Sequence, residues 1–360
     1  MTAAPPSGRP PLRQTWPPAL VARYRAAGYW RGETFPGFLR ERAQQHPDRI
    51  AVVGGDLRLT YAQLWQEAGR IGAGLLALGL QPGDRVLVQL GNEPAFISVV
   101  CALFRAGLVP VYALPAHRIG EVAHLAAKAD AGAFITSAVR DGFDHRSLAR
   151  DVQAQVPSVR HVVIAGEAED YSALDDLAGD PAQLPGDPDP QSVAFLQISG
   201  GSTGLPKLIP RTHDDYIYSF RASNGICGIN QDSVYLVALP AAHNFPMSSP
   251  GFFGALYAGA RVVLSPGPGP DAAFPLIARE RVTCCGLVPP LVGGPAAGGD
   301  VLVQADQQRH FAVVVAHGGG PPVRPHPAAR RAPDPVAGRG LPRRTGPPAG
   351  QARPLLTPPP

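Results

Sequence analysis

The stretch LQISGGSTGLPKLIPRTH, from Leu196 to His213, joins an apolar run to a loop of small residues and then to a lysine. The loop residues are Ser199, Gly200, Gly201, Ser202, Thr203 and Gly204, and the lysine is Lys207. Glycines let the backbone approach a ligand closely, so that successive N–H groups can surround anionic oxygens. The order of residues differs from the GxxxxGK[ST] and GxGxxG patterns. The stretch therefore predicts a phosphate-binding loop, with Lys207 as a point charge for a polyphosphate.

On both sides of this loop, residues 33–292 alternate apolar runs with amphipathic segments. The run IAVVGGDLRLTY predicts a hairpin that turns at Gly54–Gly55, and Thr60 can cap the helix that follows. Further strands are predicted at RVLVQL, VPVYAL, AGAFITS, RHVVIAG, VAFLQIS, SVYLVALP, ARVVLS and TCCGLVPP. Continuous apolar strands between amphipathic helices are typical of an α/β fold with layered, largely parallel sheets and flanking helices.

The composition also predicts where the protein is found, through its apolar runs, its start and its cysteines. No run of about 18 apolar residues is present, which predicts a protein without a membrane partner. The proline-rich start, residues 1–19, is expected to be flexible and has no apolar segment of a secretory signal. The four cysteines, Cys101, Cys227, Cys284 and Cys285, show no CxxC spacing and predict buried thiols in a reducing, cytoplasmic setting.

The last 68 residues differ from the rest of the chain. Residues 293–360 hold 14 Pro, 11 Gly, 11 Ala and 8 Arg but no Ser, Lys, Glu or Ile, whereas disordered tails are usually rich in Ser, Glu or Lys. This composition favours a GC-rich gene translated in a shifted frame; the alternative is a genuine, disordered Pro/Arg-rich tail. The segment also carries the excess positive charge, because residues 1–292 hold 24 basic and 25 acidic side chains. We therefore infer no nucleic-acid partner.

The loop SGGSTGLPK closely resembles the phosphate-loop signature of adenylate-forming enzymes, the superfamily of acyl-CoA synthetases, luciferases and peptide-synthetase adenylation domains. A second stretch, LPAAHNFPMSSPG from Leu239 to Gly251, resembles the branch that activates aryl acids such as 2,3-dihydroxybenzoate for catechol siderophores. GYWRGETF, PKLIPRTHDDY, FPLI and LVPP are similar to the same branch. The resemblance covers residues 20–292 and implies part of the large N-terminal adenylation domain.

The resemblance implies roles for four residues of the second stretch, His243, Asn244, Phe245 and Ser249. Related enzymes that activate amino acids have an aspartate where this chain has Asn244, which implies that Asn244 contacts an uncharged 2-hydroxyl. Phe245 would form a wall against the ring, and Ser249 would lie near the 3-position. His243 and Lys207 would act in catalysis, His243 by positioning the carboxylate and phosphate, since a carboxylate ionised at neutral pH needs no base.

His213, Asp214 and Asp215 form a small cluster that could be interpreted as metal ligands. The sequence THDDYIYSF, however, favours the start of a helix with two acids in its first turn. We therefore predict no protein metal site from these residues.

The implied reaction has two steps. An aryl carboxylate attacks the α-phosphorus of ATP, with Mg²⁺ present, and the aryl group then passes to the phosphopantetheine thiol of an aryl carrier protein. Two alternatives stay open: a salicylate–AMP or aryl-CoA ligase, and a remnant that binds ligand or carrier protein without catalysis. The choice of 2,3-dihydroxybenzoate depends on the hydroxyl of Ser249, which salicylate does not need.

The resemblance stops at residue 292. The superfamily's adenine loop, whose glutamate helps bind Mg²⁺, its ribose-binding Thr-Gly-Asp and its C-terminal lid domain with the adenylation lysine have no counterpart in residues 293–360. HFAVVVAHGGGPPV is the nearest stretch to a strand and loop there, and it lacks the acid. The expectation is a chain without the lid, with little or no adenylation activity on its own.

Overall fold

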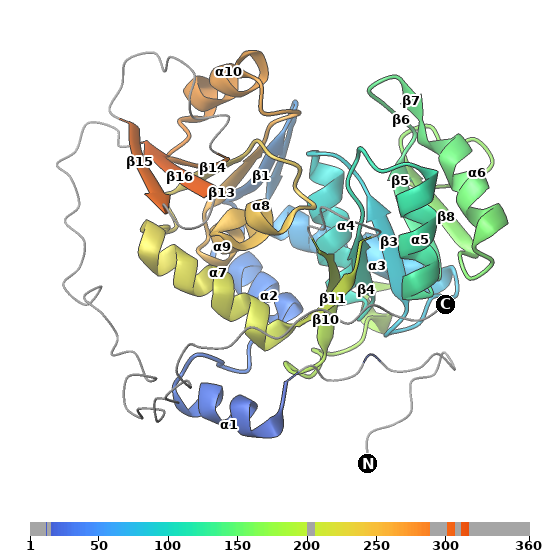
Figure 1. The fold of residues 1–360 in the computed structure, drawn as a ribbon, viewed down its shortest axis with the longest axis horizontal. Coiled ribbons are helices and arrows are strands. Elements are labelled where there is room, and N and C mark those ends of the chain that lie inside the picture. The colour runs from blue at the N-terminus through green and yellow to red at the C-terminus, as the bar shows by residue number, and fades with distance from the viewer. Residues whose placement is uncertain (1–11, 13–15, 200–205, 289–300, 307–310, 317–360) are drawn as a thin grey trace, which may run out of the picture. The chain divides into compact units, whose positions relative to one another are not determined.

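The computed structural model describes residues 12, 16–199, 206–288, 301–306 and 311–316, the last two segments as backbone only (Figure 1). Most strands belong to two sheets of seven described strands each. The first sheet has the order β15 (Val301–Asp306), β16 (Phe311–Ala316), β14 (Cys284–Leu287), β12 (Val234–Val237), β13 (Arg261–Leu264), β1 (Ile50–Gly54) and β2 (Leu57–Thr60). The second has the order β11 (Leu208–Thr212), β10 (Val193–Ile198), β4 (Val109–Tyr112), β3 (Arg85–Gln89), β5 (Ala133–Ser137), β8 (His161–Ala165) and β9 (Ser172–Ala173).

Parallel pairing dominates both sheets. The pairs β1–β13, β12–β13 and β12–β14 are parallel in the first sheet, and all pairs from β10 to β9 are parallel in the second. Antiparallel strands occur toward the edges: β2 and β11, and β16 with β15. The predicted α/β fold with largely parallel sheets is confirmed.

Helices cover the faces of these sheets. They are α1 (Pro18–Ala26), α2 (Phe35–Gln45), α3 (Tyr61–Ala77), α4 (Pro94–Arg105), α5 (Ile119–Ala129), α6 (His145–Gln155), α7 (His213–Cys227), α8 (Asn244–Ser248), α9 (Gly251–Tyr257) and α10 (Pro270–Glu280), with a 3₁₀ turn at Pro181–Gln183. Within the described residues, none is long and apolar enough to cross a bilayer.

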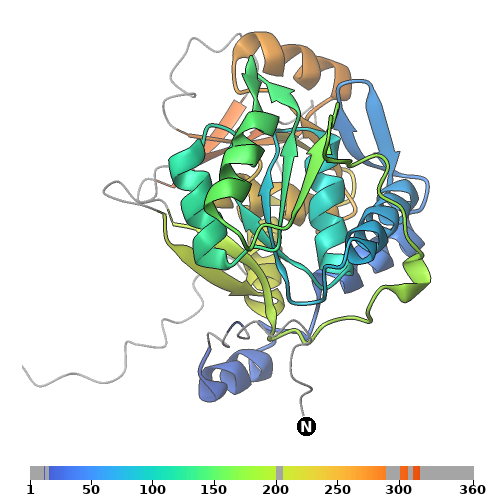
Figure 2. The ribbon, with the colours of Figure 1, turned by 90° about the vertical axis from the view of Figure 1, so that its right-hand side faces the viewer.

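The main core lies between the two sheets, where α3 and α4 are buried. Val52 of β1, Leu75 of α3, Val99 of α4 and Val88 of β3 belong to one buried cluster. A second cluster joins the other face of the second sheet to α5 and α6, which lie in front of its strands in Figure 2. A third packs α10 on the outer face of the first sheet. Apolar strands are therefore covered on both faces, as parallel sheets require.

Local signals explain several of these elements. The β1–β2 hairpin turns where predicted, and Gly55 has a φ of +58°, which a glycine adopts without strain. Thr60 caps α3: its side chain accepts a hydrogen bond from the N–H of Gln63, whose own side chain accepts one from the N–H of Thr60. This reciprocal capping box stabilises the first turn of α3.

Strands β15 and β16 lie within the segment 293–360. β16 pairs antiparallel with β14, and β15 pairs antiparallel with β16, so both extend the first sheet. β16 falls inside HFAVVVAHGGGPPV, the stretch expected to be nearest to a strand. At the other end, α1 begins at Pro18, next to the predicted boundary at residue 20. The division into 1–19, 20–292 and 293–360 remains a prediction.

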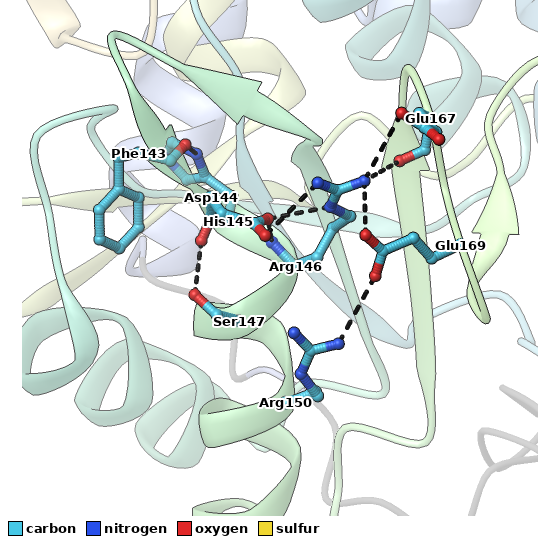
Figure 3. Close-up of polar contacts among 8 residues, drawn as sticks. All are labelled: Phe143, Asp144, His145, Arg146, Ser147, Arg150, Glu167 and Glu169. Atoms are coloured by element: carbon cyan, nitrogen blue, oxygen red, sulfur yellow. Dashed lines mark hydrogen bonds and ion pairs between the residues drawn. The ribbon is translucent and has the colours of Figure 1, made fainter.

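A network of charged residues surrounds the start of α6, next to the hairpin of β6 (Val139–Arg140) and β7 (Phe143–Asp144) (Figure 3). Asp144 accepts hydrogen bonds from the backbone N–H and Nε of Arg146, both at 2.9 Å. Arg146 also pairs with Glu169 at 2.9 Å, and Glu169 lies 3.7 Å from Arg150. These contacts join α6 to the loop after β8. Partly exposed ion pairs contribute little to stability, so we assign the network only a local structural role.

Candidate active site

The predicted phosphate loop connects β10 to β11. Its ends are joined by two hydrogen bonds: the N–H of Ser199 donates to the carbonyl of Lys207 at 2.9 Å, and the N–H of Lys207 donates to Ser199 Oγ at 3.1 Å. Lys207 is exposed. The hairpin therefore fixes where the loop leaves and rejoins the sheet. Its middle residues, Gly200, Gly201, Ser202, Thr203 and Gly204, lie outside the described residues, so their binding of phosphate remains a prediction.

The second predicted stretch begins after β12 of the first sheet. It is fastened by hydrogen bonds to Asn92, which follows β3 of the second sheet. Asn92 Nδ2 donates to the carbonyls of Leu239 at 2.9 Å and Val237 at 3.3 Å, and Asn92 Oδ1 accepts from the N–H of Ala241 at 2.8 Å. The carboxyl ends of parallel strands from both sheets thus meet at one place. Ligands of open α/β sheets bind outside such strand ends.

Helix α8 begins directly after this fastened segment. His243 is the residue before the helix and is exposed, as is Asn244 in its first position, whereas Ser249, just after its end, is half-buried. The phenyl ring of Phe245 is 6% exposed and packs over β14, where a Cβ added to Gly286 would lie 3.2 Å from its Cε1 atom. The ring of Phe245 is buried against a strand, and the exposed polar residues His243 and Asn244 come directly before it. Such a ring is suited to form one wall of an aryl pocket.

The side chain of Asn244 is held by two residues that sequence reasoning did not single out. Its Oδ1 accepts a hydrogen bond from Gln197 Nε2 at 2.6 Å and from the Tyr216 hydroxyl at 2.9 Å. Both partners are buried, Gln197 on β10 and Tyr216 in α7. Gln197 had a detectable signal, because it is the one polar residue in the strand VAFLQI. Asn92 and Tyr216 had no such signal in their local sequence.

Helix α7 begins at His213, as predicted, with His213, Asp214 and Asp215 in its first turn. Thr212 caps the helix together with Asp215. Asp214 is 2% exposed and accepts hydrogen bonds from the N–H of Gly32 at 3.0 Å and from Arg25 at 3.2 Å. These acids fasten the segment around α1 to the helix that carries Tyr216.

The same turn uses a neutral imidazole. The N–H of Phe35 donates to His213 Nδ1 at 3.2 Å, and burial lowers the pKa of His213 to about 3. His213 therefore acts as a hydrogen-bond acceptor that orders the start of α2 and not as a reacting group.

Two histidines lie near the fastened segment. Burial lowers the pKa of His243 below its ordinary value, although the residue as a whole is exposed. Burial also lowers the pKa of His117, and the nearby His243 lowers it further, while Glu121 raises it. Both rings are therefore neutral at neutral pH. A neutral His243 can donate one hydrogen bond to an anionic ligand, which fits a positioning role and adds no fixed charge.

The described part of the chain offers no group of three or more His, Cys, Asp or Glu side chains that could hold a metal ion. Within the same residues, the side chain of Ser249 makes no hydrogen bond, and its N–H donates to the carbonyl of Phe245 at 3.2 Å. The arrangement therefore joins a hydrogen-bonded amide, an aromatic wall and a hydroxyl beside the anchored ends of a glycine loop. Such a site suits an aromatic, anionic ligand next to a phosphate.

A family model and several known proteins match most of this chain. The model of the AMP-binding enzyme family matches residues 39–333, a range that extends past residue 292. The 2,3-dihydroxybenzoate-AMP ligase of Bacillus subtilis is 53% identical over 276 residues, which are 77% of this chain and 51% of that protein. The salicyl-AMP ligase / salicyl-S-ArCP synthetase of Mycobacterium tuberculosis is 45% identical, over 77% of this chain and 50% of that protein.

Among solved structures, the apo structure of MbtA from Mycobacterium smegmatis matches with a TM-score of 0.73 and 46% identity. The match covers 77% of this chain and 52% of that one. The chain thus spans about half the length of the relatives it matches.

Proposed function

This chain belongs to the AMP-binding enzyme family, and on that premise we propose that its reaction is the ATP-dependent activation of an aryl acid as aryl-AMP. The observation that carries the proposal is the amide of Asn244, hydrogen-bonded to Gln197 and Tyr216 beside the buried ring of Phe245. An uncharged polar group at this position suits an acid with an uncharged ortho hydroxyl. Relatives named for 2,3-dihydroxybenzoate and salicylate support the same class of substrate.

Each residue of the site has a proposed task. The loop Ser199–Gly204 and Lys207 would hold the β- and γ-phosphates, so that the carboxylate meets the α-phosphorus and pyrophosphate leaves. Phe245 would stack against the aryl ring, and His243 would donate a hydrogen bond to the carboxylate or the phosphate. The contribution of these groups is positioning and charge neutralisation, which account for most of the catalysis of phosphate chemistry.

Magnesium would accompany ATP as its usual counterion in this reaction. The described residues do not form a carboxylate cluster suited to the ion, and the glutamate that the superfamily uses was not found in the sequence. No residue of this chain is therefore assigned to Mg²⁺.

For the substrate we propose 2,3-dihydroxybenzoate, in the pathway of a catechol siderophore. The half-buried Ser249 follows α8 and makes no side-chain hydrogen bond within the described residues, which leaves its hydroxyl for a 3-hydroxyl group. Salicylate is the second candidate, and the relative of Mycobacterium tuberculosis favours it. The aryl group would pass to the phosphopantetheine of an aryl carrier protein. Four free cysteines agree with a reducing cytoplasm as the site of action.

The test measures the binding of 2,3-dihydroxybenzoate, salicylate and benzoate to the 360-residue chain by calorimetry. We expect both hydroxybenzoates to bind at least about fivefold more tightly than benzoate, because an amide that loses its partner costs about 1–3 kcal/mol. Asn244→Asp should weaken the two hydroxybenzoates by about tenfold, since its carboxylate repels the ionised acid.

Asn230→Asp is the matched control, because Asn230 is exposed and precedes β12, outside the site. It should leave all three affinities unchanged. Benzoate that binds as tightly as salicylate would refute the proposal. Pyrophosphate exchange measured on the same chain should be little or none, and robust exchange dependent on 2,3-dihydroxybenzoate would overturn that expectation.

A further inference from the structure

The amide of Asn244 has two ends, and the structure assigns them different tasks. Oδ1 lies within hydrogen-bonding distance of two buried donors, Gln197 Nε2 at 2.6 Å and the Tyr216 hydroxyl at 2.9 Å. A third hydroxyl, Ser248 Oγ, lies 3.5 Å from the same oxygen, at the outer limit for a hydrogen bond. Within the described residues, nothing accepts from Nδ2, and Asn244 is an exposed residue.

We propose that Gln197 and Tyr216 are positioning residues that fix the amide of Asn244 with Nδ2 toward the ligand, so that the pocket selects ortho groups that accept a hydrogen bond and disfavours ortho groups that donate one. This inference rests on the proposed function, since it takes the ligand to be an aryl acid whose ortho group meets Asn244. It adds a rule for selectivity, set by two residues that need not touch the ligand.

Tyr216 can hold this orientation because its hydroxyl keeps its proton. The side chain is fully buried, and burial raises the pKa of the hydroxyl above its ordinary value. A neutral phenol has one proton to donate, and the acceptor at 2.9 Å is Asn244 Oδ1. If the amide were rotated by half a turn, Nδ2 would face Gln197 Nε2, which cannot accept, and that buried hydrogen bond would be lost.

The chemistry of ortho-substituted benzoates makes the rule specific. An ortho hydroxyl donates its single proton to the neighbouring carboxylate, so its lone pairs point outward and can accept from Nδ2. An ortho amino group also donates one proton to the carboxylate, but its second N–H points outward, toward another donor. Salicylate and 2-aminobenzoate have the same shape and charge at neutral pH, so a difference in affinity between them reports the direction of this hydrogen bond.

The experiment measures dissociation constants of salicylate and 2-aminobenzoate for the full 360-residue chain, with benzoate as the reference acid. We expect salicylate to bind at least about fivefold more tightly than 2-aminobenzoate, the lower range for one unmet buried donor. Tyr216→Phe and Gln197→Met each remove one donor, and the double variant removes both. In these variants the dissociation constant of 2-aminobenzoate divided by that of salicylate should fall stepwise toward one, because the amide of Asn244 becomes free to turn.

Tyr112→Phe is the matched control, because Tyr112 is buried like Tyr216 but its hydroxyl has no hydrogen-bond partner within the described residues. The ratio in this variant should equal that of the parent chain. A general loosening of the pocket would weaken both acids alike and leave the ratio unchanged, which separates a positioning role from a merely structural one. Urea unfolding of each variant shows that it is folded.

The outcomes separate the two proposals. If salicylate and 2-aminobenzoate bind equally, if 2-aminobenzoate binds more tightly, or if the ratio survives in a folded double variant, the orientation of Asn244 is refuted while aryl-acid binding stands. If neither salicylate nor 2-aminobenzoate binds more tightly than benzoate, the proposed function fails, and this inference fails with it.

Discussion

Gly286 shows how closely the residues around the proposed aryl pocket are packed. A Cβ atom at this position of β14 would lie 2.8 Å from the Tyr235 hydroxyl and 3.2 Å from the ring of Phe245. Contacts of 2.8 Å are shorter than carbon and oxygen tolerate, so one of the two rings would have to move. The absence of a side chain at Gly286 therefore lets the ring of Phe245 pack closely against β14.

Gly286→Ala should accordingly weaken both stability and binding. We expect the free energy of unfolding in urea to fall by about 1–3 kcal/mol, the usual cost of overpacking, and salicylate to bind less tightly. Gly225→Ala is the control: Gly225 is exposed in α7 with no atom within 4 Å of an added Cβ. This control should be more stable by about 0.5–1 kcal/mol. A Gly286→Ala chain as stable as its parent would contradict the packing argument.

At the scale of elements, α7 is the helix through which distant parts of the chain reach the pocket. Its first turn receives hydrogen bonds from Arg25, Gly32 and Phe35, and one turn later it presents Tyr216 to Asn244. The segment before α2 therefore supports the helix whose Tyr216 donates a hydrogen bond to Asn244. Residues near position 30 contribute to a site near position 244 without lying in it.

The neutral His213 gives this support a dependence on pH. Its pKa is lowered from 6.5 to about 3 in the folded chain, so between these values the unfolded chain takes up a proton that the folded chain does not. The free energy of unfolding should thus fall as pH decreases from about 6.5, by up to about 1.4 kcal/mol per pH unit from this residue. His213→Gln keeps an acceptor for Phe35 but does not titrate.

Urea unfolding of the parent chain and of His213→Gln, at several pH values between about 4 and 8, measures this effect. The parent should lose stability more steeply than the variant below about pH 6.5, and the difference between them should be constant above it. Parallel curves over the whole range would show that His213 gains its proton in the folded chain as readily as in the unfolded one.

Elements with local signals were predictable, and contacts between distant elements were not. Thr60 with Gln63 and the acids at the start of α7 follow from short-range rules for helix ends, and the strands follow from their apolar runs. His243, Asn244, Phe245 and Ser249 were found through a resemblance, and their roles stay predictions. Gln197 stood out as the one polar residue of its strand, but its partner and that of Tyr216, Asn244, is 47 and 28 residues away, so neither contact was predicted. No periodicity encodes such a distance.

At the scale of the whole molecule, the segment 293–360 combines two opposing signals. Its composition favours a shifted reading frame, whereas the family match extends to residue 333 and β15 and β16 pair with β14. The relatives are about twice as long as the range that this chain covers. The adenine, ribose and lid elements expected of the superfamily decide whether turnover is possible.

Sequencing the gene across codons 285–300 and translating all three frames tests the shifted frame. We expect another frame to continue with an aromatic-Gly-Met-Ala/Thr-Glu loop, a Thr-Gly-Asp and a lysine-bearing lid. The protein translated in that frame should then show pyrophosphate exchange that depends on an aryl acid. If none of the frames contains these motifs, residues 293–360 are a genuine tail, and the catalytic proposal should give way to a binding remnant.

The three-residue contact at Asn244 also has a consequence for anyone who redesigns this scaffold. Its members come from β10, α7 and α8, three separate parts of the chain. Grafting the short stretch around α8 from an enzyme with another acid preference would place a different side chain at position 244, next to the unchanged donors Gln197 and Tyr216. Under the proposed selectivity rule, a transplant must therefore exchange positions 197 and 216 together with 244, because the three side chains form one discontinuous unit.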